Sequence, residues 1–133
     1  MGNEAPLPFS GVRGFARFEP RPPLGCGKLT SMSRPPVLDM EDIVKAMALL
    51  HPDWDLTSGK LHRELTFPDF VSAFACMTEV ALVAERIDHH PEWSNVYNRV
   101  VVDLATHDPV GITQLDLDLA TAIDRSSGRQ IAQ

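Results

Sequence analysis

The residues with the greatest capacity for chemistry in this sequence are two consecutive histidines, His89 and His90, which are followed directly by Pro91. Two acidic residues, Glu85 and Asp88, lie just before them. An imidazole can both donate and accept a proton near neutral pH, so histidines beside carboxylates are suited to general acid–base catalysis. Taken alone, the same residues are also compatible with a purely structural pair at the end of a helix.

A metal site is the alternative chemistry for neighbouring histidines, and their spacing argues against it. Histidines that bind zinc from one helix stand at positions i and i+4, whereas adjacent side chains on a helix diverge by about 100°. The two cysteines, Cys26 and Cys76, fit neither a paired metal-ligand spacing nor a disulfide framework, and Cys76 is expected to be a buried apolar residue. We therefore expect no metal site. Two of the other histidines, His51 and His62, are expected at the surface.

The chain divides into two segments of different composition. Residues 1–37 contain seven of the eleven prolines and five of the eight glycines, and their five basic and two acidic residues give a net charge of +3. Such a segment cannot readily form a helix, a sheet or a core, so we predict a mostly disordered extension. It lacks the features of a secretory, transit or myristoylation signal. We predict that this segment is a dispensable tail, or that it lies upstream of a native start at Met32 or Met40. Organelle targeting is the alternative.

The remaining residues, 38–133, carry seven basic and sixteen acidic side chains, a net charge of −9 that opposes direct binding of nucleic acid. The hydrophobic fraction of 44% and the charged fraction of 23% are typical of a globular protein. No apolar run approaches the roughly 20 residues of a membrane span. We expect one cytoplasmic domain over residues 38–126, followed by a C-terminal tail over residues 127–133.

The spacing of apolar residues predicts a helix, a hairpin, a long helix, a strand and a final helix. These elements are expected over residues 40–50, 54–67, 68–88, 95–107 and 114–126. Asp39, Thr66 and Thr113 are the predicted N-caps of the three helices, and Gly59 is the predicted turn of the hairpin. The order indicates an α+β fold, with an antiparallel sheet and helices packed on one of its faces.

The long helix carries an apolar stripe at helical spacing, which predicts its buried face. The members of the stripe are Phe70, Phe74, Met77, Ala81, Ala84 and Ile87. Such a stripe is more typical of a core than of a cofactor site. In the strand that follows, alternate residues from Val96 to Leu104 are expected to face the core.

The string AERIDHHPEWSNVYNRVVVDLATHD resembles the signature of the pterin-4a-carbinolamine dehydratase family, in which His-His-Pro is followed by a third histidine at the end of the next strand. Here the third histidine is His107. The segments FPDF at 67–70 and GIT at 111–113, the latter leading to Asp116, also match, and the resemblance covers roughly residues 38–124. It implies an α+β domain with a four-stranded antiparallel sheet and three helices on one face.

The resemblance also implies an activity. Members of the family are lyases that convert a 4a-hydroxytetrahydropterin to quinonoid dihydropterin and water during tetrahydrobiopterin recycling, without a metal or cofactor. By this resemblance, His89 and His107 would form the acid–base pair that handles the leaving 4a-hydroxyl and its compensating proton. His90 would mainly bind and orient the pterin ring.

Roles for three further residues follow from the same resemblance. Glu85 and Asp88 would hold the histidines and contact the polar edge of the pterin, and Trp93 would pack against the wall of the site. Some members carry a basic residue where this chain has Leu115, so contacts from that position are not expected. A homodimer or a homotetramer is implied. The alternative function is a non-catalytic interaction module, because animal members also act as dimerisation partners of a transcription factor.

Overall fold

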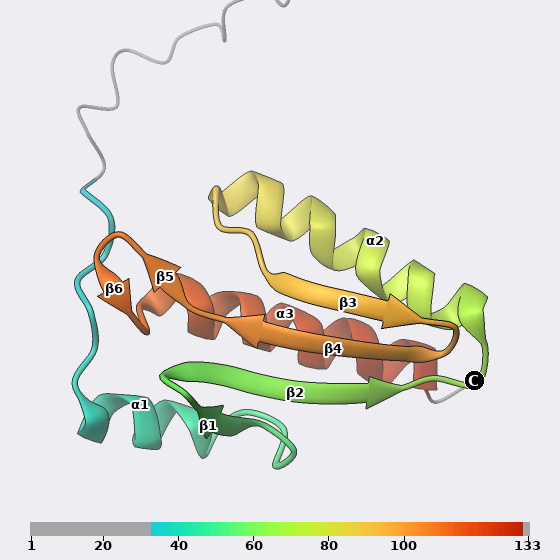
Figure 1. The fold of residues 1–133 in the computed structure, drawn as a ribbon, viewed down its shortest axis with the longest axis horizontal. Coiled ribbons are helices and arrows are strands. Elements are labelled where there is room, and N and C mark those ends of the chain that lie inside the picture. The colour runs from blue at the N-terminus through green and yellow to red at the C-terminus, as the bar shows by residue number, and fades with distance from the viewer. Residues whose placement is uncertain (1–32, 132–133) are drawn as a thin grey trace, which may run out of the picture. The chain divides into compact units, whose positions relative to one another are not determined.

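A computed structural model describes residues 33–131, and residues 1–32 and 132–133, with most of the predicted N-terminal extension, lie outside the described part. Figure 1 shows the elements in chain order: α1 (Met40–Met47), β1 (Asp55–Thr57), β2 (Lys60–Thr66), α2 (Phe70–Ile87), β3 (Glu92–Val96), β4 (Arg99–Leu104), β5 (Thr106–His107), β6 (Val110–Gly111) and α3 (Gln114–Ile131). Residues 33–39 form neither a helix nor a strand. Among the described helices, none combines the length and apolar character needed to cross a membrane.

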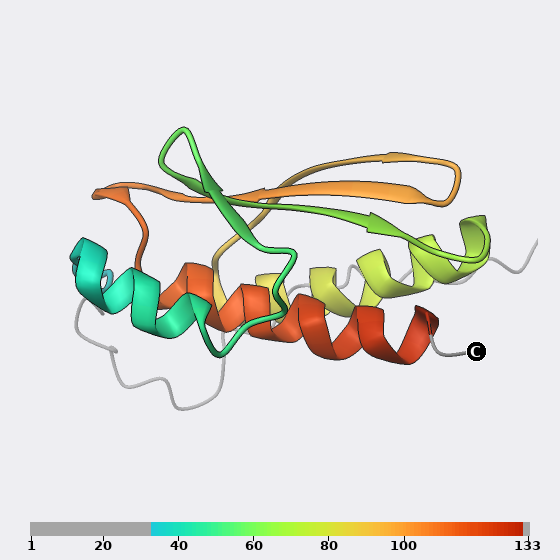
Figure 2. The ribbon, with the colours of Figure 1, turned by 90° about the horizontal axis from the view of Figure 1, so that it is seen from below.

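The main sheet has four antiparallel strands in the order β1-β2-β4-β3, so β1 and β3 are its edges. Strands β5 and β6 form a separate two-stranded pair. All three helices lie on one face of the main sheet (Figure 2). The α+β prediction, with four antiparallel strands and three helices on one face, is therefore confirmed.

The hairpin of β1 and β2 turns as predicted at Gly59, whose φ of +76° favours glycine. Side chains of β2 then alternate, because successive residues of a strand point to opposite faces. Three residues of β2 are buried on one face of the sheet, each paired with a buried residue of β4. The pairs are Leu61 with Leu104, Arg63 with Val102, and Leu65 with Val100.

The single strand predicted over residues 95–107 is wrong, because the chain reverses between Val96 and Arg99, which pair with each other. Tyr97 adopts a positive φ of 51° at this turn, and no glycine or proline marks it in the sequence. The side chain of Asn95 supports the turn instead, because it donates to the backbone oxygens of Tyr97 and Arg99, at 3.0 and 2.9 Å. The predicted inward face within β4 is correct.

Helix α2 begins after Asp69, whose side chain accepts a hydrogen bond from the Ser72 backbone N–H at 2.8 Å. Thr66, the predicted N-cap, is instead the last residue of β2. The predicted buried stripe is also wrong in part: Phe70 and Phe74 are 45% and 54% exposed, and the buried residues are Ala73, Cys76, Val80 and Ala84. Apolar residues occupy more than one face of this helix, so their spacing is compatible with two different buried stripes. The stripe that packs inward is the one with the smaller residues.

Helices α1 and α3 begin where the sequence predicts. Asp39 caps α1 by accepting a hydrogen bond from the backbone N–H of Asp42 at 2.9 Å. Helix α3 follows Thr113 and continues to Ile131, so the predicted helix end at residue 126 and the predicted tail over 127–133 are wrong. The reason is that Ser126 and Ser127 are buried against neighbouring elements, where they do not act as a polar helix end.

Candidate active site

The end of α2 determines where the two adjacent histidines point. Asp88 caps the helix in a left-handed conformation, with a φ of 51° and a ψ of 44°, and the next backbone N–H, that of His89, donates to the carbonyl of Ala84 at 3.0 Å. This reversal separates the two side chains: His89 is only 5% exposed, whereas the side chain of His90 is 60% exposed.

The buried histidine is paired with a buried carboxylate. Nε2 of His89 lies 2.6 Å from Oδ1 of Asp116, and Asp116 is fully buried. The other carboxylate oxygen, Oδ2, accepts hydrogen bonds from the hydroxyl of Thr106 and the backbone N–H of Thr113, both at 2.8 Å. The sequence marked Asp116 only as part of the match to the family motif. In the structure its carboxylate orients His89.

His90 and His107 have carboxylate partners at the surface. Nε2 of His90 lies 3.0 Å from Oε2 of Glu85, and Nε2 of His107 lies 3.1 Å from Oε1 of Glu92. Lys60 donates to Oε2 of the same Glu92 at 2.6 Å, and this hydrogen bond is the main reason that the pKa of Glu92 is lowered. Sequence reasoning missed Glu92 and Lys60, because they come together only by strand pairing.

One open pocket of about 310 Å³ brings the three histidines together. Its lining residues are Arg34, Asp88, His89, His90, Ala105, His107 and Asp108. Glu85 reaches this pocket only through His90, and Trp93 packs against the hydrophobic core opposite Val102. Arg34 and Asp108 were not singled out from the sequence. The pocket thus combines three imidazoles with charged groups of both signs.

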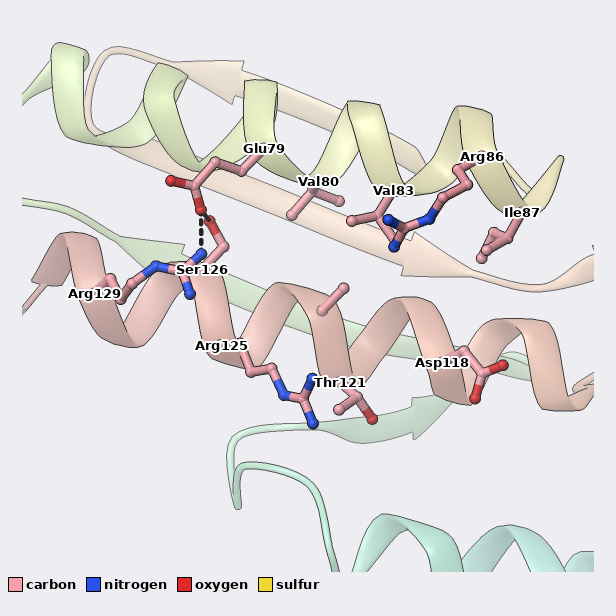
Figure 3. Close-up of a pocket in the computed structure, with 11 residues that line it drawn as sticks. Glu79, Val80, Val83, Arg86, Ile87, Asp118, Thr121, Arg125, Ser126 and Arg129 are labelled. Atoms are coloured by element: carbon pink, nitrogen blue, oxygen red, sulfur yellow. Dashed lines mark hydrogen bonds and ion pairs between the residues drawn. The ribbon is translucent and has the colours of Figure 1, made fainter.

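A second pocket, of about 270 Å³, lies between α2 and α3 and contains none of the predicted site residues. Figure 3 shows its side chains, with Glu79 accepting hydrogen bonds from Ser126 at 2.6 Å and from Arg129 at 2.5 Å. Because no histidine lines this groove, the capacity for acid–base chemistry belongs to the histidine pocket. In residues 33–131, no group of three or more histidine, cysteine or acidic side chains is arranged to hold a metal ion.

The fold and the pocket define a class of small α+β domains that gather histidines at the end of a helix and of an adjacent strand. Comparison with known proteins gives the family. The family model for pterin 4 alpha carbinolamine dehydratase matches residues 36–126. The chain belongs to the pterin-4-alpha-carbinolamine dehydratase family.

Individual relatives agree with this assignment. A relative from Rhizorhabdus wittichii that carries the family's name is 52% identical over 95 residues, which cover 70% of this chain and 96% of that protein. A relative of the same name from Prochlorococcus marinus (strain MIT 9515) is 43% identical over 91 residues, which cover 68% and 94% of the two chains. The crystal structure of a transcriptional coactivator/pterin dehydratase from Brucella Melitensis is 40% identical, with a TM-score of 0.67, over 70% of this chain and 100% of that one.

Proposed function

We propose that this protein dehydrates a 4a-hydroxytetrahydropterin to quinonoid dihydropterin and water, as a step in tetrahydrobiopterin recycling. The observation that carries the proposal is the meeting of His89, His90 and His107 in one pocket, each with a carboxylate within 3.1 Å. Membership of the family supports the same reaction. The proposed location is the cytoplasm.

The reaction needs one proton delivered and one removed. The C4a–O bond breaks as the lone pair on N5 forms the C=N bond, and a proton delivered to the departing oxygen makes it leave as water. The N5 proton is then taken up by a base, so the atoms and charges balance. Positioned imidazoles contribute typically about 10²–10⁴-fold to such a step.

In this proposal the acid–base pair is His89 and His107. Asp116 holds Nε2 of His89, so Nδ1 is the nitrogen of that ring that remains for the substrate. His107 belongs to the short strand β5, and its partner Glu92 lies on the edge strand β3. His90, held by Glu85 at the rim, binds and orients the pterin ring.

The direct test is the rate of dehydration of a chemically generated 4a-hydroxytetrahydropterin, followed by ultraviolet absorbance with and without the purified full-length protein. We expect acceleration that is proportional to protein concentration. A rate equal to that of the uncatalysed reaction, from protein shown to be folded by circular dichroism, would contradict the enzymatic proposal.

Chelation is expected to leave the activity unchanged, because the proposed steps use only imidazoles and carboxylates. The rate should be measured before and after exhaustive dialysis against EDTA, with a zinc enzyme dialysed in parallel as a control for the treatment. A loss of activity that returns when a divalent metal is added back would contradict the metal-free mechanism.

A non-catalytic interaction module is the second candidate, and an exposed apolar face of α2 favours it. Phe70, Val71, Phe74 and Leu82 are between 45% and 75% exposed on this helix. The relative from Brucella Melitensis also carries the words transcriptional coactivator in its title. We propose self-association, as a homodimer or homotetramer, through this face or the edge strand β3. Failure of the dehydration test would leave the interaction module as the better description.

A further inference from the structure

The segment before α1 is fixed against the short pair of strands beside the histidine pocket. The backbone N–H of Leu38 donates to the carbonyl of Ile112 at 2.8 Å. Val37 packs so closely on Gly111 that a Cβ added to this glycine would lie 2.6 Å from Cγ1 of Val37. Gly111 also has a φ of +145°, which disfavours any other residue. The chain is therefore held in place three residues after Arg34.

Two prolines, Pro35 and Pro36, connect this anchor to Arg34. The pyrrolidine ring fixes φ near −65°, so consecutive prolines form a short and stiff spacer. The spacer limits the positions that Arg34 can take, and in the structure Arg34 lines the same pocket as the three histidines. A residue outside the family match of residues 36–126 thus contributes to the candidate site.

In the described part of the chain, no carboxylate forms an ion pair with the guanidinium of Arg34. Five basic side chains there form ion pairs with acidic ones, namely Lys45, Lys60, Arg63, Arg99 and Arg129. Within residues 33–131, Arg34, Arg86 and Arg125 have no carboxylate within 4 Å, and of these three only Arg34 lines the histidine pocket. A guanidinium without a carboxylate partner can donate to an acceptor on a ligand.

We propose that Arg34 is a substrate-binding residue that donates hydrogen bonds to the 4-carbonyl oxygen of the pterin. This inference rests on the proposed function, since it takes the pterin as the ligand. The histidines act on the hydroxyl at C4a and on N5, and C4a is bonded directly to the 4-carbonyl carbon. That carbonyl oxygen is therefore the ring acceptor nearest to the reacting atoms. A fixed cation does not assist the step itself, because positive charge develops on C4a and N5, so the contribution of Arg34 is to binding.

The test is to compare Arg34→Gln and Arg34→Lys with the wild type in the dehydration assay. Arg34→Gln removes a hydrogen bond from a charged donor at an exposed site. We therefore expect KM to rise about tenfold and kcat to change by less than about twofold. Arg34→Lys keeps the charge without the planar fork and should give an intermediate KM. The dissociation constant of 7,8-dihydrobiopterin, measured by fluorescence, should change in parallel with KM.

A matched control is Arg86→Gln, which removes an exposed arginine from the groove between α2 and α3 (Figure 3). This variant should keep the wild-type KM, as should a chain that begins at Met32 and so retains Arg34. An unchanged KM and dissociation constant in Arg34→Gln would overturn the inference. A loss of kcat at unchanged KM would also overturn it. Absence of activity and of pterin binding in the wild type would instead defeat the proposed function.

A second substrate tests whether Arg34 donates to the ring carbonyl of the pterin or to the side chain at C6. The assay is repeated with a 4a-hydroxytetrahydropterin that carries only methyl groups at C6. The same increase in KM for Arg34→Gln supports the ring carbonyl, which both substrates share. An increase that is confined to the substrate with the hydroxylated side chain overturns the assignment to the carbonyl.

Discussion

Replacing His89 with alanine is expected to lower the rate of pterin dehydration by about 10²–10⁴-fold, the usual contribution of a positioned acid or base. The same loss is expected for His107→Ala, because dehydration needs both an acid and a base. Both chains should still fold. In His89→Ala, Oδ2 of Asp116 keeps its hydrogen bonds from Thr106 and Thr113, whereas Oδ1 loses the hydrogen bond to His89, so we expect this variant to fold with reduced stability.

The measurement is kcat/KM for each variant, with circular dichroism and thermal melting to verify folding. His62→Ala is the matched control: His62 also pairs with a carboxylate, that of Asp103 at 2.8 Å, but it does not line the histidine pocket. We expect this control to retain nearly the wild-type rate. Wild-type rates in both His89→Ala and His107→Ala would refute the assigned roles.

Asp116→Asn extends the experiment to the residue that orients His89. Asparagine retains the shape of the side chain and an acceptor oxygen but lacks the negative charge beside the imidazole. We therefore expect a smaller loss of rate than in His89→Ala. A loss as small as that of the His62→Ala control would show that this carboxylate serves only the fold.

Removing Arg63 is expected to give the largest loss of stability among single substitutions of charged residues. Arg63 is 3% exposed, and its guanidinium pairs with Asp124. Asp124 also accepts hydrogen bonds from the indole N–H of Trp54 at 2.7 Å and the backbone N–H of His51 at 2.8 Å. Breaking a buried ion pair by removing one partner costs about 3–5 kcal/mol, because the remaining charge is left uncompensated. Arg63→Ala should lower the free energy of unfolding by about this amount.

The matched control is Arg99→Ala, which removes an arginine of the adjacent strand. Arg99 pairs with Glu64 at 2.6 Å, but both side chains are at least half exposed. Exposed pairs contribute only about 0–1 kcal/mol, since water screens the charges. Urea denaturation followed by circular dichroism gives both values. Equal losses in the two variants would contradict the interpretation that burial makes the Arg63 pair important.

The sequence by itself determined the features that depend on neighbouring residues. Asp39 and Thr113 mark the starts of two helices, and Gly59 marks the first hairpin, because caps and tight turns are made within a few residues. Alternating residues of β4 predicted its inward face. The histidine motif, with His107 at its end, indicated the family before any contact was known.

The tertiary structure alone decided what depends on packing between distant segments. The buried face of α2 is set by contact with α3 and the sheet, and an apolar helix does not reveal that choice in its own spacing. The partnership of His89 with Asp116 joins residues 27 positions apart. Arg34 lines the histidine pocket beside a segment held by the packing of Val37 on Gly111 and the hydrogen bond from Leu38 to Ile112. Long-range contacts of this kind arise when the core closes, so the residue types suggested the chemistry and the fold selected its partners.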